Sequence, residues 1–233
     1  MSFVTKFFKD YLFYFLLRRY YGKDVFLFFE PFFYDTITTK QGLTYKVSEV
    51  ALADISSSLS DYDFSDIRKD DVVLDIGAGH GGFTLPAARQ AKHVYAVEPL
   101  FCTNLQENLA LNNINNVTVL PFALGDGTDI KINYGGVAKL IKTVTFPQLI
   151  QQCGDIDFLK CDCEGGEWLI TPEMLKGIRR LEFELHATPD MDRRYVEHLI
   201  ERKYKIKTIN GPNDFAYLVF HGYYNDDDTI IDR

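Results

Sequence analysis

The stretch LDIGAGHGGF, from Leu74 to Phe83, constrains the fold of this chain more than any other part of the sequence. It follows the apolar run VVLDI and sets Gly77, Gly79 and Gly82 in the spacing G-x-G-x-x-G. Glycine at these positions lets the backbone turn sharply and lets a ligand approach it closely. The pattern by itself suits a dinucleotide, an adenosyl group that carries a sulfonium, or a tight turn without a ligand.

Apolar runs and amphipathic stretches alternate along the rest of the chain. We expect strands in VVLDIGAG, HVYAVEP, VTVLPFAL, IDFLKCDCEG and RLEFELHA, helices in GFTLPAARQA, FCTNLQENLALNN, FPQLIQQC, EWLITPEMLKGI and RRYVEHLIERK, and a closing strand pair in YKIKTING and FAYLVFHG. Residues 45–60 are also expected to be helical. This order predicts an α/β fold with a doubly wound, mostly parallel seven-stranded sheet.

The sequence before this pattern is rich in aromatic residues. Residues 1–35 hold 15 of the chain's 34 aromatic residues, and we expect an amphipathic helix there. It would cover the core, a second copy of the chain, or a membrane surface. The apolar run YLFYFLL is too short for a membrane span, which needs about 20 residues, and no small-residue cleavage site follows it. We divide the chain into an extension (1–60), a main domain (61–222) and an acidic tail (223–233).

Charge and cysteine content bear on partners and compartment. The net charge is -8 with a pI near 5.1, which argues against broad electrostatic binding to nucleic acid, although a local basic patch would escape this average. We therefore do not expect nucleic acid as a partner. The four cysteines lack zinc-binding spacing, so we expect a reducing, cytoplasmic location with or without membrane contact.

Two carboxylates distinguish the candidate ligands of the glycine loop. Glu98 ends the second predicted strand, 21 residues after Gly77, where a carboxylate accepts hydrogen bonds from a ribose in both cofactor classes. Asp75 immediately precedes the loop. It would repel a pyrophosphate but suit the ammonium of a methionine moiety, which favours S-adenosylmethionine over a nicotinamide dinucleotide.

Several longer motifs carry a family resemblance. VVLDIGAGHGG followed by VYAVEP is similar to the first two strands of the class I methyltransferases. NLALNNINNVTVLPFALGD and TVTFPQLIQQCGDIDFLKCDCEGGEWLI resemble the FkbM-like methyltransferase family, whose fourth strand reads close to L-K-x-D-x-E-G-x-E. The resemblance covers roughly residues 70–190. Pro147 departs from it, because an acidic residue is common there, and this raises the question of how the following helix is capped.

The resemblance implies S-adenosylmethionine as the cofactor. It implies that the glycines line the methionine and ribose end, that Glu98 holds the ribose hydroxyls, and that the Ala123 amide lies near the adenine edge. The implied cofactor-binding residues are Asp75, Gly77, Ala78, Gly79, Gly81, Glu98, Pro99, Phe122, Ala123 and Leu124. His80, inside the loop, would face either substrate or solvent.

Acidic residues and one histidine gather where two predicted strands end. The candidate catalytic residues are Asp162, Glu164, Glu167, Glu184 and His186. Asp162 and Glu164 would share a strand face, and His186 is the base best matched to neutral pH. The alternative is that these side chains only cap helices and tie strand ends together. Their spacing defines no metal coordination shell, so we expect no metal site, although a divalent metal held by their oxygen atoms is left open.

The sequence lacks the motifs of two other methyl-transfer chemistries. No N-P-P-Y-like run for planar nitrogens and no Pro-Cys nucleophile for base carbons is present. We therefore expect methylation of a hydroxyl on a sugar, a lipid or another small metabolite, with the acceptor pocket built from residues 1–60 and 127–142. The alternatives are an RNA (tRNA) methyltransferase, a NAD-dependent oxidoreductase, and a non-catalytic adaptor that keeps the cofactor fold.

Overall fold

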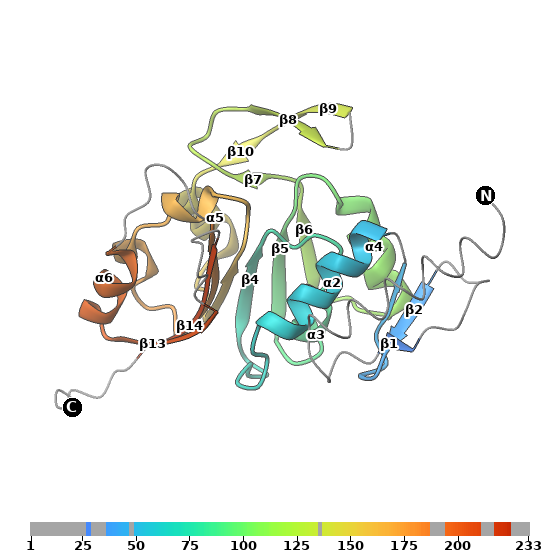
Figure 1. Cartoon of the computed structure of the whole chain (residues 1–233), viewed down its shortest axis with the longest axis horizontal. Helices are drawn as coiled ribbons and strands as arrows, with labels where there is room; N and C mark the ends of the chain where they lie inside the picture. Colours follow the sequence, from blue (N-terminus) through green and yellow to red (C-terminus); the bar gives the residue numbers. More distant parts are fainter. Residues whose placement is uncertain are drawn as a thin grey trace.

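A seven-stranded sheet forms the centre of the molecule (Figure 1). The computed structural model describes residues 27–28, 36–46, 49–134, 137–186, 194–210 and 217–224. The strand order is β13-β14-β12-β11-β4-β5-β6. Their bounds are β4 Val72–Ile76, β5 His93–Val97, β6 Val117–Leu120, β11 Phe158–Cys161, β12 Arg180–His186, β13 Tyr204–Asn210 and β14 Tyr217–Tyr224.

The sheet confirms the expected fold class. Strands β12, β11, β4, β5 and β6 run parallel, while β14 lies antiparallel between β12 and β13. After β4 the chain adds β5 and β6 on one side of β4, and it later adds β11 and β12 on the other side. The strand order therefore reverses at β4. This is the Rossmann-like methyltransferase arrangement. The predicted closing pair is the antiparallel contact of β13 with β14.

Hydrophobic clusters cover both faces of the sheet because successive side chains of each strand point to opposite sides. Leu74 and Ile76 of β4 join one cluster, and Val73 joins another with Phe83 and Phe158. The helices are α3 Thr84–Ala88, α4 Cys102–Leu111, α5 Phe146–Cys153 and α6 Tyr195–Glu201. Each lies in a segment for which the sequence predicts a helix.

The described part of the N-terminal extension packs on this domain. It comprises the short strands β1 Leu27–Phe28, β2 Thr36–Thr39 and β3 Thr44–Lys46, and the helix α2 Glu49–Asp61. Ile37, Tyr45 and Ile55 share a hydrophobic cluster with Ala78 and Leu105 of the main domain. The expected helix over residues 45–60 thus starts later, after β3. The rest of the aromatic segment 1–35, and the tail beyond Tyr224, lie outside the described residues.

Prolines explain two further differences from the sequence-based expectations. The run VTVLPFAL divides at Pro121 into β6 and β7 (Ala123–Leu124), since proline cannot donate to a strand ladder. The run EWLITPEMLKGI forms two short 3-10 helices, η1 Gly166–Leu169 and η2 Pro172–Leu175. Thr171 between them is extended because the residue before a proline avoids the helical region.

Pro147 causes no difficulty for the helix that contains it. Thr145 caps α5, accepting a hydrogen bond from the Gln148 amide, while the Gln148 side chain accepts one from the Thr145 amide. Pro147 occupies the first turn, where its missing N–H has no helical partner to lose. Among the described residues, no helix combines the length and apolarity that crossing a membrane requires.

A β-hairpin stands over the carboxyl edge of the parallel strands (Figure 1). It consists of β8 Ile130–Tyr134 and β9 Val137–Ile141. The parallel pair of β7 with β10 (Thr143–Val144) lies at its base. The hairpin lies within the segment 127–142 that the sequence marks as an insertion.

Candidate active site

The glycine loop is crowded by the protein itself. Gly77 has φ +78°, and a Cβ there would lie 1.7 Å from the carbonyl oxygen of Asp162. Gly79 has φ +53°, and its added Cβ would lie 2.3 Å from Oδ2 of Asp54 in α2. Gly81 is also left-handed, at φ +93°. Neighbouring chain segments therefore require glycine at these positions, whether or not a ligand binds.

Glu98 holds the glycine loop against the end of β5. Its side chain is buried, and Oε2 accepts a hydrogen bond from the Gly79 amide at 2.8 Å. Oε1 accepts from the amides of Leu100 and Phe101 at 2.6 and 2.9 Å. A carboxylate offers about four acceptor positions, so these three bonds leave capacity for a ribose hydroxyl. The predicted ribose role of Glu98 stays a prediction.

Asp75 lies in the interior, bonded to other side chains. It is fully buried, accepts a hydrogen bond from the Thr84 hydroxyl at 2.5 Å and lies 3.3 Å from Nζ of Lys160. Its expected contact with a ligand's ammonium stays a prediction. Lys160, also buried, donates to the Gly77 carbonyl oxygen at 2.7 Å. Asp75 therefore acts on the loop through Lys160.

Burial and charge oppose each other at this pair. Burial lowers the pKa of Lys160, but the carboxylates of Asp75 and Asp162 outweigh it, and the pKa is raised overall. Burial raises the pKa of Asp75, and the Lys160 charge only partly offsets this. The lysine is thus a fixed cation beneath the glycine loop.

The residues expected around adenine lie together, but one of them is already bonded. The Ala123 amide donates to the Lys142 carbonyl oxygen at 3.0 Å, in the pairing of β7 with β10. It is therefore not free for the adenine edge. Leu124 is buried in the core, Phe122 is half-buried, and the Pro99 carbonyl oxygen accepts from Nζ of Lys139 at 2.8 Å.

His80 does not face solvent. It is buried, its Nδ1 lies 2.7 Å from Oδ2 of Asp54, and its ring lies 4.3 Å from that of Phe101. The same Asp54 oxygen accepts from the His80 amide at 2.7 Å. Helix α2 therefore anchors the glycine loop through Asp54.

The five candidate catalytic residues come together around His186, at the carboxyl ends of β11 and β12. Its Nδ1 lies 3.2 Å from Oε1 of Glu167, and its Nε2 lies 3.6 Å from carboxylate oxygens of both Glu164 and Glu184 and 4.0 Å from Oδ1 of Asp162. Strand β11 ends at Cys161, and Glu164 has φ +61°. The sequence predicted that Asp162 and Glu164 share a strand face, and this is wrong because both residues follow the end of β11. The turn after the strand brings both side chains toward His186.

The electrostatics raise the pKa values of both His186 and Glu184. The hydrogen bond to Glu167 and the charge of the surrounding carboxylates raise the pKa of His186 to about 9. Burial and the neighbouring Asp162 raise the pKa of Glu184 to about 7. The raised pKa favours the protonated form of His186 at neutral pH, and its expected role as a base stays a prediction. Glu184 is the group that titrates near neutrality.

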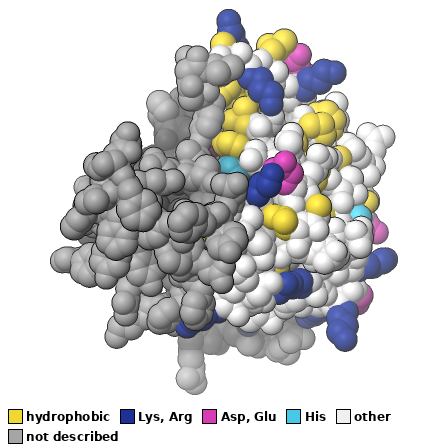
Figure 2. Space-filling model, turned by 90° about the vertical axis from the view of Figure 1, so that its right-hand side faces the viewer, with side chains coloured by type: hydrophobic (Ala, Val, Ile, Leu, Met, Phe, Trp, Pro, Cys, Tyr) yellow, Lys and Arg dark blue, Asp and Glu magenta, His cyan; other side chains and the backbone are white. Residues whose placement is uncertain are grey.

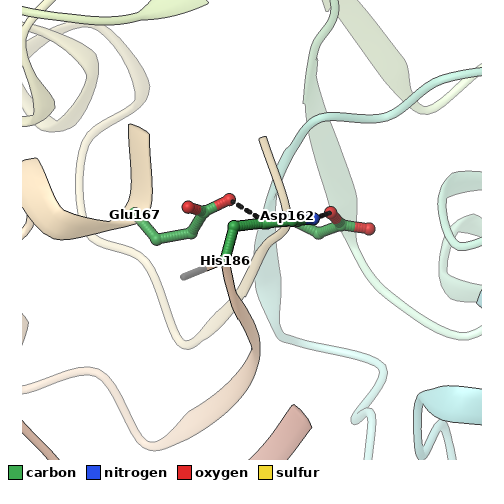
Figure 3. A group of neighbouring side chains, drawn as sticks. All are labelled: Asp162, Glu167 and His186. Atoms are coloured by element: carbon green, nitrogen blue, oxygen red, sulfur yellow. Dashed lines mark hydrogen bonds and ion pairs between the residues drawn. The ribbon is translucent and has the colours of Figure 1, made fainter. Parts of the chain in front are cut away.

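Three of these residues also lie close enough to hold a cation. Figure 3 shows Asp162, Glu167 and His186 converging, with ligand atoms all within 4.8 Å of one another. Glu167, however, is fully buried and accepts from the amides of Cys163 and Gly165 at 2.5 and 2.8 Å. These bonds and the His186 contact lower the pKa of Glu167 although burial opposes them. The expectation of no metal stays a prediction.

Three residues of the site were not expected from the sequence to be functional. They are Lys160, Asp54 and Tyr62, whose hydroxyl donates to Oδ2 of Asp162 at 2.9 Å. A lysine inside the apolar run IDFLKC was a usable signal for the first. Asp54 and Tyr62 carry no local signal, because their partners lie 26 and 100 residues away in the chain.

Comparison with known proteins finds partial relatives. No protein-family model matches the chain. An uncharacterized RNA methyltransferase of Streptococcus agalactiae serotype V is 33% identical over 93 residues, 36% of this chain and 21% of that protein. The 23S rRNA (uracil(1939)-C(5))-methyltransferase RlmD of Klebsiella pneumoniae is 47% identical over 55 residues, 23% of this chain and 13% of that protein. The chain thus spans about a fifth or less of the length of these relatives.

The chain is also similar to solved structures. The structure of M. jannaschii TYW2 in complex with AdoMet matches with a TM-score of 0.49 and 20% identity, over 86% of this chain and 92% of that one. A likeness of this degree carries no argument about function. None of these matches singles out the FkbM-like family.

The expectation that nucleic acid is not a partner is wrong. The matched relatives are named as RNA methyltransferases, and the overall acidic charge does not exclude such a substrate. The average charge misleads because electrostatic recognition depends on local patches.

The fold is that of the class I S-adenosylmethionine-dependent methyltransferases.

Proposed function

We propose that this chain is an S-adenosylmethionine-dependent methyltransferase whose acceptor is RNA. The observation that carries the methyltransferase assignment is the glycine loop at the reversal point of a β13-β14-β12-β11-β4-β5-β6 sheet, with Glu98 buried against it. Ligands of open α/β sheets bind outside the carboxyl ends of the strands at such a point. The cofactor would lie over Gly77 and Gly79, with Glu98 toward its ribose.

The acceptor class is supported by the relatives and not by the site alone. Their matched regions are short, so the substrates named for the whole proteins come to this chain as part of the proposal. The cluster around His186 supports an oxygen as the methylated atom. A hydroxyl becomes a good nucleophile when a nearby group removes its proton during methyl transfer.

Glu184 is the general base of this proposal. Its pKa of about 7 lets it accept a proton near neutral pH, and Tyr62, 3.4 Å from its Oε2, helps to orient it. His186 remains a cation that balances the surrounding carboxylates. The hydroxyl would belong to an RNA ribose or base substituent.

A second candidate is methylation of a hydroxyl on a small metabolite. The same carboxylate cluster favours it, because deprotonation by Glu184 does not depend on the size of the acceptor. Nothing in the cluster selects RNA over a small molecule.

Labelled cofactor distinguishes the candidates. The protein is incubated with methyl-labelled S-adenosylmethionine and a cell extract, with or without ribonuclease treatment, and the label is followed into RNA and small-molecule fractions. Ribonuclease-sensitive label supports RNA, and label only in small molecules supports the second candidate. A chain that does not bind S-adenosylmethionine in calorimetry would refute the methyltransferase assignment.

The role of Glu184 has its own control. Glu184→Gln should abolish most turnover while leaving cofactor affinity unchanged and melting temperature little changed, because the lost carboxylate was repelled by Asp162 and attracted by His186. Glu201→Gln, on an exposed position of α6, is the matched control and should keep full activity. Equal turnover in both variants would remove Glu184 from the mechanism.

A further inference from the structure

The β8–β9 hairpin differs in charge from the acidic average of the chain. Residues 130–142 contain three lysines and no acidic residue, whereas the whole chain has 33 acidic and 25 basic residues. Asp126 and Asp129 stand just before the hairpin, so the positive charge is confined to the hairpin itself.

One face of the hairpin combines positive charge with an exposed apolar side chain. Lys131 pairs across the hairpin with Leu140, so their side chains share a face. Lys131 is exposed and Leu140 is 68% exposed, and the exposed Lys142 follows two residues after Leu140. At the top of the molecule, where Figure 1 places the hairpin, Figure 2 shows dark blue and yellow side chains with magenta beside them. We call Lys131, Leu140 and Lys142 the outer face.

The opposite face fixes the hairpin to the cofactor end of the sheet. Ile141 is buried, and Lys139 donates from Nζ to the Pro99 carbonyl oxygen, one residue after Glu98. At the base, the Thr143 hydroxyl donates to the Thr128 carbonyl oxygen at 2.8 Å and accepts from the Gly127 amide at 3.1 Å. The outer face is therefore held at a defined place above the cofactor edge.

We propose that the outer face binds the phosphate backbone of single-stranded RNA and guides it to the cofactor. Lysines bind phosphates as point charges, and the exposed leucine beside them offers an apolar surface to a base that is not stacked in a helix. The interleaving of charge and apolar surface separates this face from a simple solvated lysine patch. The inference rests on the proposed RNA acceptor and assigns the element that contacts it.

Charge reversal on this face is the test. Lys131→Glu/Lys142→Glu should weaken binding to a fluorescein-labelled single-stranded RNA of mixed sequence by at least about tenfold in fluorescence anisotropy. Two lost phosphate contacts should also make the slope of log affinity against log salt shallower by about 1.4. Calorimetric affinity for S-adenosylmethionine should stay unchanged, since neither side chain is among the residues expected to bind the cofactor.

A matched control separates local contact from net charge. Lys69→Glu/Lys92→Glu changes the charge equally on exposed residues at the opposite, amino edge of the sheet. RNA binding that falls equally in both double variants, or in neither, overturns the assignment of the hairpin. Wild-type protein that binds no RNA but methylates a small hydroxyl compound refutes the proposed acceptor instead, so the two failures are distinguishable.

Discussion

Replacing the buried lysine of β11 should reveal how the glycine loop is supported. Lys160→Met keeps the length of the side chain but removes the cation that faces Asp75 at 3.3 Å. Asp75 and Lys160 are 0% and 1% exposed, so water cannot replace the lost partner. Removing one member of a buried ion pair costs about 3–5 kcal/mol. We expect the free energy of unfolding to fall by about that amount at pH 8.

The loss should depend on pH because Asp75 can take up a proton. Without Lys160, its folded-state pKa rises further above the unfolded value of 3.8, in the direction that burial already drives it. A carboxyl group whose pKa is raised on folding contributes stability at low pH, which is lost as pH rises through the folded value. The deficit of Lys160→Met should therefore be smaller at pH 5 than at pH 8.

Urea denaturation followed by circular dichroism measures both effects. Lys69→Met, at an exposed position, is the control and should change stability by less than about 0.5 kcal/mol. The double variant Asp75→Asn/Lys160→Met should be more stable than Lys160→Met alone, because it no longer buries an unpaired charge. A Lys160→Met variant that loses under about 1 kcal/mol, equally at both pH values, would refute the role of Lys160 as the counter-ion of Asp75.

Three other predictions follow from single residues. Gly77→Ala should lose more stability and cofactor affinity than Gly154→Ala. The two glycines have similar φ angles, +78° and +80°, but only a Cβ at Gly77 would meet backbone atoms. Equal melting temperatures of the two variants would contradict this. Glu98→Ala should weaken S-adenosylmethionine binding by about 1–3 kcal/mol in calorimetry, and an unchanged dissociation constant would leave Glu98 a purely structural group. His186 has a folded pKa of about 9 against 6.5 unfolded, so it stabilises the fold below pH 6.5 and loses this as pH rises through 9. Thermal melts of His186→Gln should lack that decline, and a parallel decline in both proteins would count against the ion-pair cluster.

Local patterns were sufficient for the main architecture. The alternation of apolar strands with helices, and the turn at Gly77, predict a mostly parallel sheet because both are periodic or steric properties of neighbouring residues. The same holds for the positions of α4 and α5. The expected clustering of carboxylates also followed from sequence, since parallel strand ends meet at one edge. Pro121 and Pro172 interrupt two of the predicted elements. The apolar runs around them nevertheless predicted one continuous strand and one continuous helix.

The chemistry of the site depended on tertiary contacts. Register places Lys160 beside Asp75, and packing of α2 brings Asp54 to the glycine loop. No local pattern predicts either contact, because each joins segments far apart in the chain. The base assignment changed for the same reason. An isolated histidine titrates near neutral pH, but carboxylates converge on His186 only in the fold. Their charge raises the pKa of His186, and burial raises that of Glu184, which is why we propose Glu184 as the base.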